Sequence, residues 1–209
     1  MAKKQKITHR EILIITVLVV LVGLFATTGF KGPSLITGAI SGKANVTLQS
    51  LLSINFVANQ DSVTFGSGRV EPTCTNVTLT TNDTSQDPQN CWTGTYGYNT
   101  TDNAFEIEND GNRIANVTVN GTNATTFIGG ASAVPLFEFF GAQAETNSCF
   151  QGLQTSWTTI DDTPQTLCER FRFQKPRDQL YTHIKVRIPE DSAAGTHNAT
   201  VEFIATLSA

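Results

Sequence analysis

Apolar and polar side chains alternate with a period of two along several short segments after residue 44. In the clearest one, Leu180–Ile188, one side would hold Ile184 and Val186 and the other His183 and Lys185. This period is typical of a strand with one buried face. Similar patterns predict strands at 44–49, 52–56, 63–70, 77–79, 104–109, 114–119, 134–140, 157–160 and 199–205. Because no segment has the period of an amphipathic helix, we predict an all-β domain of eight to ten strands, a single antiparallel β-sandwich.

Two connectors predict which strands pair. The turn Asn109–Asn112 joins segments 104–109 and 114–119, and Asn, Asp and Gly at such a position favour a hairpin. The connector Pro189–Thr196 is too short for a helical crossover, so we expect the last two strands to be antiparallel neighbours as well.

A different pattern precedes the strands. The run Ile12–Phe30 is apolar and carries no charge, which is typical of a transmembrane helix or the core of a signal peptide. Basic residues stand just before it, and an excess of positive charge keeps that end in the cytoplasm: Lys3, Lys4, Lys6 and Arg10. We therefore expect a cytoplasmic segment 1–11, a membrane helix 12–30, a flexible stalk 31–43 and an extracellular β-sandwich 44–209.

Whether the helix is retained or removed stays open. Its apolar core is longer than that of most signal peptides, which favours a retained anchor. The segment Ile36–Gly42 nevertheless offers small residues to a peptidase, with Ala39 and Ser41 as candidates. No Cys follows the run, so a lipid anchor is not expected.

Charge is divided unevenly along the chain. The formal net charge of the 209 residues is −4, but residues 41–209 hold nine basic and 17 acidic residues, a charge of −8. Such a domain repels nucleic-acid phosphates and anionic lipid headgroups, so nucleic acid is not an expected partner. Membrane contact is expected through the N-terminal helix alone.

The four cysteines, Cys74, Cys91, Cys149 and Cys168, all lie on the expected exported side, where disulfides persist. Of the three possible connectivities, we expect the sequence-local one, Cys74–Cys91 and Cys149–Cys168, because each pair brackets a polar insertion between strands. A zinc site is the alternative, but it requires close pairs such as C-x₂-C, which are absent from the sequence.

N-glycosylation sequons are the strongest local chemical signal. Eight asparagines begin an N-x-Ser/Thr sequence without Pro: Asn45, Asn76, Asn82, Asn99, Asn116, Asn120, Asn123 and Asn198. A chain rich in Asn and Thr also produces sequons by chance. Asn45, Asn116 and Asn198 alternate with apolar residues, so we expect these three to face solvent.

Two short motifs carry a resemblance. Ile107–Asn112 followed by Val117–Val119, and Ile188–Thr196 followed by Ala199–Phe203, resemble hairpins of immunoglobulin-like domains in archaeal and bacterial surface proteins. The plan of membrane run, stalk and one sandwich is similar to small exported archaeal proteins, including fibre-forming subunits of the TasA and camelysin family. The resemblance covers under a quarter of the chain and implies an immunoglobulin-like fold and a surface location, with no catalytic residues.

Catalytic motifs are scarce, and we expect neither an enzyme nor a cofactor. His9 is expected in the cytoplasm, His183 on a polar strand face and His197 in a turn. Glu106 and Glu108 lie two residues apart, which is typical of a solvated strand face. The turns at 109–112 and 161–162 offer oxygen ligands for calcium, but Asn, Asp and Gly favour turns without any ion, and we therefore predict no metal site.

These patterns together predict a membrane-anchored or secreted structural or adhesive protein of the cell surface, able to assemble with itself or with other surface proteins. The alternative is a binding module whose loops recognise a glycan or a peptide. The segment 44–56 is an apolar edge-strand candidate, which either completes its own sheet or is donated to a neighbouring subunit. A short stalk favours the first, since it keeps the strand close to its own domain.

Overall fold

A computed structural model of the chain describes residues 50–82, 89–96 and 104–208. The predicted membrane helix, the stalk and the strand 44–49 lie outside these residues, as do Asn45, Asn99 and His9. Within the described ranges, no helix is long and apolar enough to cross a membrane.

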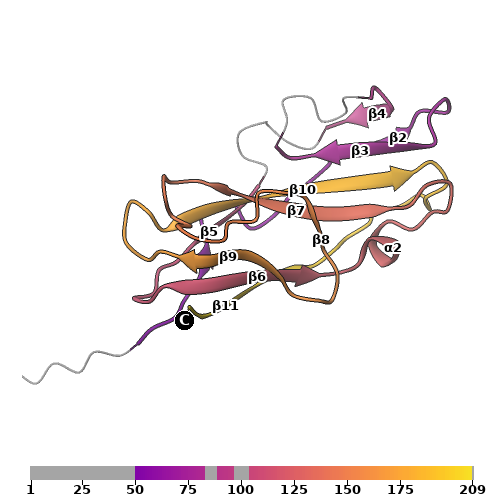
Figure 1. Ribbon diagram of the computed structural model, residues 1–209. Coiled ribbons are helices and arrows are strands. Elements are labelled where there is room, and N and C mark those ends of the chain that lie inside the picture. The colour runs from indigo at the N-terminus through magenta and orange to yellow at the C-terminus, as the bar shows by residue number, and fades with distance from the viewer. Residues whose placement is uncertain (1–49, 83–88, 97–103, 209) are drawn as a thin grey trace, which may run out of the picture. The chain divides into compact units, whose positions relative to one another are not determined.

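The described chain is all-β, as predicted, and its strands pair antiparallel (Figure 1). It contains one short helix, α2 (Ala124–Phe127), and eleven strands, slightly more than the eight to ten expected. The strands are β1 (Asn55–Phe56), β2 (Ser67–Val70), β3 (Asn76–Thr80), β4 (Trp92–Thr95), β5 (Phe105–Glu108), β6 (Ala115–Gly121), β7 (Leu136–Gln143), β8 (Thr158–Thr159), β9 (Gln165–Phe171), β10 (Gln179–Pro189) and β11 (Val201–Leu207).

The larger sheet has six strands and is organised around β10. One edge of β10 pairs with β7 along most of its length, and β8 adds two residues beyond β7. The other edge of β10 pairs first with β5 and then with β3, while β1 lies outside β5. The length of β10 therefore allows one strand to hold two shorter ones end to end.

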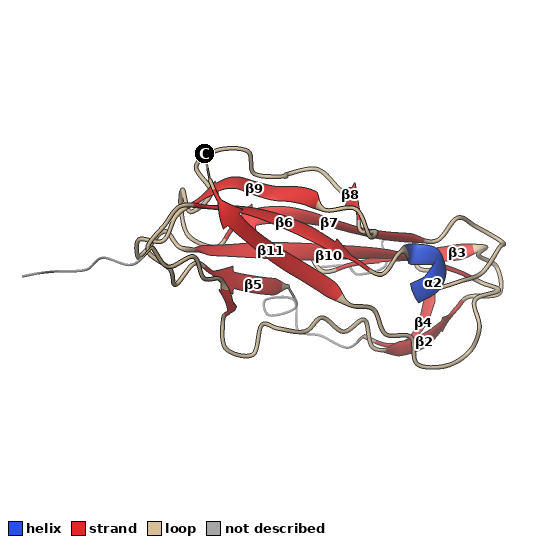
Figure 2. Ribbon diagram, turned by 90° about the horizontal axis from the view of Figure 1, so that it is seen from below, coloured by secondary structure: helices blue, strands red, loops and turns tan. Residues whose placement is uncertain are grey.

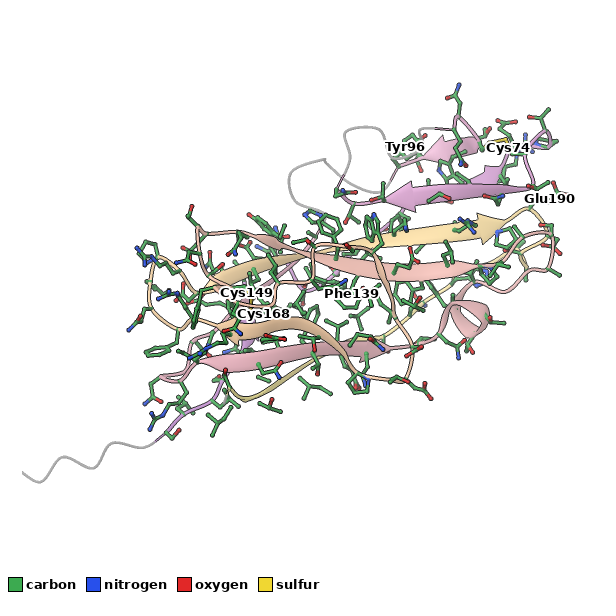
Figure 3. All side chains as sticks on the ribbon, viewed as in Figure 1. Cys74, Tyr96, Phe139, Cys149, Cys168 and Glu190 are labelled. Carbon is green, nitrogen blue, oxygen red and sulfur yellow. A yellow bond between two sulfur atoms is a disulfide. The ribbon has the colours of Figure 1, made fainter. Side chains whose placement is uncertain are left out.

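A second sheet has three strands in the order β11-β6-β9, and β2 pairs with β4 in a separate ribbon. Figure 2 shows β11, β6 and β9 side by side, and Figure 1 shows this sheet as a separate layer from β10 and β7. Both layers contribute to one core, where Phe139 of β7, Val117 of β6 and Ile184 of β10 are buried. Figure 3 places Phe139 between the layers. Burial of this apolar surface is the main stabilising term.

Both predicted hairpins are wrong. β5 pairs with β1 and β10, whereas β6 pairs with β11 and β9 in the other sheet. Likewise β10 belongs to the six-stranded sheet and β11 to the three-stranded one. Each connector therefore carries the chain from one layer to the other. As a result, the inward side chains of the two strands that it joins face each other across the core and do not lie side by side in one sheet.

One side of the two layers is closed by the chain between β7 and β9. Gly141 N of β7 donates to Gln154 O (2.7 Å), and Gln154 N donates to Leu167 O of β9 (2.9 Å). The bridging segment thus bonds to both sheets. Ile160, just after β8, is fully buried in the core.

At the opposite side, aromatic rings from both layers meet. Phe56 of β1, Phe105 of β5 and Phe203 of β11 lie with ring centroids 5.6–5.9 Å apart. β1 pairs with β5 of its own chain, so residues 55–56 extend the six-stranded sheet.

The first and last described residues lie at the same end of this domain. Leu51 N donates to Asn112 Oδ1, and Asn112 N donates to Leu51 O, both at 2.9 Å. Ser208 N donates to Ile114 O (3.1 Å) two residues further along. The loop between β5 and β6 therefore holds both the first and the last described segments of the chain.

Candidate functional site

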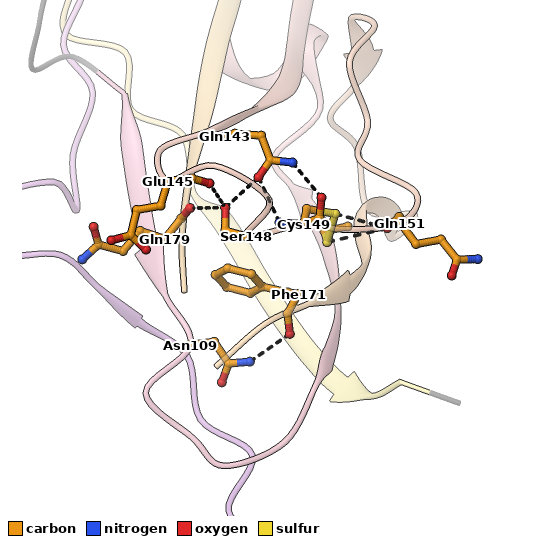
Figure 4. Close-up of a disulfide and its surroundings, with 9 residues drawn as sticks. Asn109, Gln143, Glu145, Ser148, Cys149, Gln151, Phe171 and Gln179 are labelled. Atoms are coloured by element: carbon orange, nitrogen blue, oxygen red, sulfur yellow. Dashed lines mark hydrogen bonds between the residues drawn. A yellow bond between two sulfur atoms is a disulfide. The ribbon is translucent and has the colours of Figure 1, made fainter. Parts of the chain in front are cut away.

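Both predicted disulfides are present. Cys149–Cys168 joins the segment after β7 to β9, with its Cα atoms 5.9 Å apart and both cysteines buried. Around it, Gln143 Nε2 donates to Cys149 O, and Gln143 Oε1 accepts from Cys149 N (Figure 4). Ser148 Oγ lies within hydrogen-bond distance of Gln143 Oε1 and of Gln179 O. This disulfide therefore lies beside a partly buried polar network that fixes the bridging segment to β7 and β10.

Cys74–Cys91 lies near β2 and β4, with its Cα atoms 5.8 Å apart. Glu71 N donates to Cys91 O and Cys74 N donates to Glu71 O, so the cysteines flank a tight loop. Within the described ranges no cysteine is free. The zinc alternative is excluded, since disulfide sulfurs are not thiolate ligands.

Six of the eight predicted glycosylation sites lie within the described residues. Asn116 and Asn120 are on β6 in the three-stranded sheet, Asn123 is the N-cap of α2, and Asn198 precedes β11. Asn198 and Asn123 are exposed, whereas Asn116 and Asn120 are half-buried on the outer side of the sheet. The remaining two, Asn76 and Asn82, lie at the start of β3 and just after its end.

The outer face of the six-stranded sheet carries aromatic and charged residues. Trp157 packs edge-to-face on Phe140 at 4.6 Å, and Lys185 Nζ lies 4.6 Å from the centre of the Trp157 ring. Lys185 also forms an ion pair with Glu138, its neighbour on β7. The rings on this face are thus already occupied by side chains of the same domain.

His183 was expected on the surface but is half-buried in this same group, stacked on Phe140 at 4.9 Å. Thr81 Oγ1 accepts from Ile184 N, so its hydroxyl proton is available to His183 Nδ1 at 3.3 Å. Burial lowers the pKa of His183, and a hydrogen bond with the backbone of Thr81, distinct from the hydroxyl contact, opposes this shift only in part.

The expectation of a solvated face for Glu106 is wrong. Glu106 is only 8% exposed, because the chain after β1 covers it: Val57 N donates to Glu106 O and Glu106 N donates to Gln60 O. Burial raises the pKa of Glu106, and the nearby carboxylates of Glu145 and Glu108 raise it further. Burial likewise raises the pKa of Asp178, whose backbone N–H donates to Glu145.

The two turns considered for calcium use their oxygens within the fold. Asn109 is fully buried; its Nδ2 donates to Phe171 O and its Oδ1 accepts from Gly111 N. Asp161 Oδ1 accepts from Thr163 N two residues later. In the part of the chain that the structure describes, no group of three His, Cys, Asp or Glu side chains could hold a metal ion.

A shallow hollow of about 430 Å³ lies where the first and last described residues meet. Ser50, Arg113, Arg170 and Phe173 contribute to its lining. Arg113 Nε donates to Ser50 Oγ, and the guanidinium of Arg170 lies 4.9 Å from the ring of Phe150. Neither arginine forms an ion pair within the described ranges, although the domain is rich in acidic residues. Sequence reasoning missed this group because its members come from distant segments.

No protein-family model matches the chain, and the chain has no significant match among curated proteins or solved structures. Inferences about its role therefore depend on its own residues.

Proposed function

We propose that the protein is a structural or adhesive component of the cell surface, held by its N-terminal apolar segment or released from it by cleavage. Its β domain would lie outside the cytoplasm, and we propose an immunoglobulin-like sandwich because of its two packed layers, since the two motifs that resemble hairpins cross between the layers instead. It would contact copies of itself or other surface proteins, and we propose no enzymatic role.

The pair of disulfides is the observation that carries this proposal. All four cysteines of the chain are used, and each disulfide closes a loop of similar length. Reducing conditions in the cytosol keep such cysteines as thiols, whereas disulfides form and persist outside it. The sequons and the basic residues before the apolar run point in the same direction.

An exposed strand edge supports assembly. Among the described strands β11 pairs only with β6, so its second edge has no strand beside it. Ile204 and Leu207 of β11 are 38% and 60% exposed. An open edge with exposed apolar side chains is a surface that proteins usually cover or pair.

A binding module is the second candidate, and the arginine-lined hollow favours it. Arginines without a carboxylate partner suit acidic groups of a ligand, and an acidic oligosaccharide would fit an open, shallow surface of this kind. Titration calorimetry with polygalacturonate, comparing the protein with its Arg113→Gln/Arg170→Gln variant, would test this role. Equal heats for the two proteins would exclude the hollow as the site.

The structural proposal is tested in cells of the source organism. Impermeant biotin should label the protein on intact cells, and negative-stain microscopy of envelope fractions with an antibody should show it in fibres or a lattice. Labelling only after lysis would refute the location. Dispersed monomers in labelled cells would refute the structural role while leaving the binding role in place.

A further inference from the structure

Four sequons lie together on the three-stranded sheet and at one of its ends. Along β6 the side chains of Val117 and Val119 are fully buried, so the period of two places Asn116, Thr118 and Asn120 on the opposite, outer side. Thr122 N donates to Thr200 O and Thr200 N donates to Thr122 Oγ1, at 3.0 and 3.2 Å. This pair brings the segments that carry Asn123 and Asn198 side by side.

The sequon of Asn116 presents both of its required groups on the same side of β6. An asparagine and a threonine two residues apart in a strand share one face. Thr118 thus accompanies Asn116. The register places Ile204 and Thr166 beside Thr118 on the flanking strands, whereas Glu202 of β11 lies opposite Asn120, so Asn116 has the less acidic surroundings along β11.

The orientation of the side-chain amides is the second observation. Oδ1 of Asn116 and Oδ1 of Asn120 are both buried without a hydrogen-bond partner, whereas neither Nδ2 atom is buried and unsatisfied in this way. The Oδ1 of Asn123 is engaged as well, since it accepts from Thr126 N of α2 at 2.9 Å. In all three, Nδ2 is the atom left for chemistry at the surface. By contrast, Asn76 Nδ2 donates to Thr75 Oγ1.

We propose that the outer face of the three-stranded sheet is a glycan-bearing face, modified at Asn116, Asn120, Asn123 and Asn198. The inference rests on the proposed function, because only an exported domain meets a glycosyl phosphate donor outside the cytoplasm. In the reaction Nδ2 forms a bond to the anomeric carbon and loses one proton. The bond between that carbon and the donor phosphate breaks, and its electron pair leaves with the phosphate oxygen.

The spacing of the acceptors is compatible with full occupancy. Asn116 and Asn120 are four residues apart along β6, which corresponds to roughly 14 Å in an extended strand. Attachment at Nδ2 leaves the amide carbonyl in place, so the cap that Asn123 provides to α2 is retained.

Glycopeptide mapping by mass spectrometry of the full chain, purified from its own envelope, tests the proposal. A protease other than trypsin is needed, since no Lys or Arg lies between Arg113 and Arg170. We expect a glycan on each of the four asparagines, and one glycan mass lost in each Asn→Gln variant. Thr118→Ala should remove the glycan from Asn116 alone, while the matched control Thr118→Ser should keep it.

Two results would overturn either the glycan-bearing face or the proposed function. A protein that is labelled on intact cells but has unmodified Asn116 or Asn120, or carries glycans only at other sequons, overturns the glycan-bearing face and leaves the proposed function standing. A protein that biotin cannot reach on intact cells overturns the proposed function itself.

Discussion

The two sheets share one core but differ in what covers their outer faces. On the six-stranded sheet, Trp157, Phe140 and Lys185 pack on one another, so this face is sealed by the domain's own side chains. On the three-stranded sheet, Asn116, Thr118 and Asn120 are half-buried, and the amide oxygens of both asparagines are turned away from solvent. One outer face therefore contributes to stability, while the other is free to be modified or contacted.

The largest effect should come from the disulfide that fixes the segment leading to Trp157. The Cys149→Ser/Cys168→Ser variant should lose about 3 kcal/mol or more of unfolding free energy, because loop closure is lost and two polar hydroxyls enter a buried site. Cys74→Ser/Cys91→Ser, with a loop of similar length, is the matched control and should lose less, since Cys74 is only half-buried. Chemical denaturation measures both. An equal loss in the two variants would mean that loop entropy alone sets the contribution of each disulfide to stability.

The second effect compares the outer faces directly. Trp157→Ala should cost about 2 kcal/mol, because it removes the contacts with Phe140 and Lys185. Thr118→Ala on the other face, in unglycosylated protein, should change stability by less than about 0.5 kcal/mol. Urea denaturation of the two variants measures both losses of unfolding free energy. Similar losses would contradict the proposed difference between the two faces.

A smaller effect is expected from the ion pair on the sealed face. Lys185 and Glu138 are each less than one-fifth exposed, so their coupling should exceed that of a surface pair and reach about 1 kcal/mol. A double-mutant cycle with Lys185→Met and Glu138→Gln measures it. Lys175 and Glu108 form the control pair, since Lys175 is largely exposed, and should couple more weakly.

The smallest effect is a pH dependence. Burial lowers the pKa of His183 below its value in the unfolded chain, so the unfolded state binds the proton more readily. The stabilisation is complete above the unfolded-state pKa of about 6.5 and is lost as the pH falls from there through the lower pKa of the folded state. Glu106 and Asp178 have raised pKa values and act in the opposite sense, losing stabilisation as the pH rises from their unfolded values. The difference between wild type and His183→Gln, followed by denaturation between pH 7.5 and 5.5, isolates the histidine; no change in slope would contradict the assignment.

Most strand positions could be predicted from the sequence, because the side-chain period records which face is buried, but β4 and the core strand β9 were missed. Val201, Phe203 and Ala205 alternate inward in β11 as expected, and the disulfides followed from the short separation of their cysteines. Such patterns are local in the sequence and depend little on which distant residues they contact.

Pairing could not be predicted in the same way. An inward alternation is identical whether the next strand returns beside the first or crosses to the opposite layer, so the turn at Asn109–Asn112 gave a wrong hairpin. Glu106 was misassigned for a related reason: its neighbours in sequence are uninformative, and the segment that covers it, residues 57–60, is far away in the chain. The hollow lined by Arg113 and Arg170 likewise exists only after folding.

The shared location of Leu51 and Ser208 has a consequence for protein engineering. A tag or fusion partner placed after Ser208 would emerge beside the segment that enters the domain at residue 50, and would compete with it for space. The connector between β10 and β11 leaves from the other end of the strands, and Gly195 within it is exposed. A peptide epitope inserted at Gly195 should therefore be displayed well away from the tether, with little disturbance to the sheets.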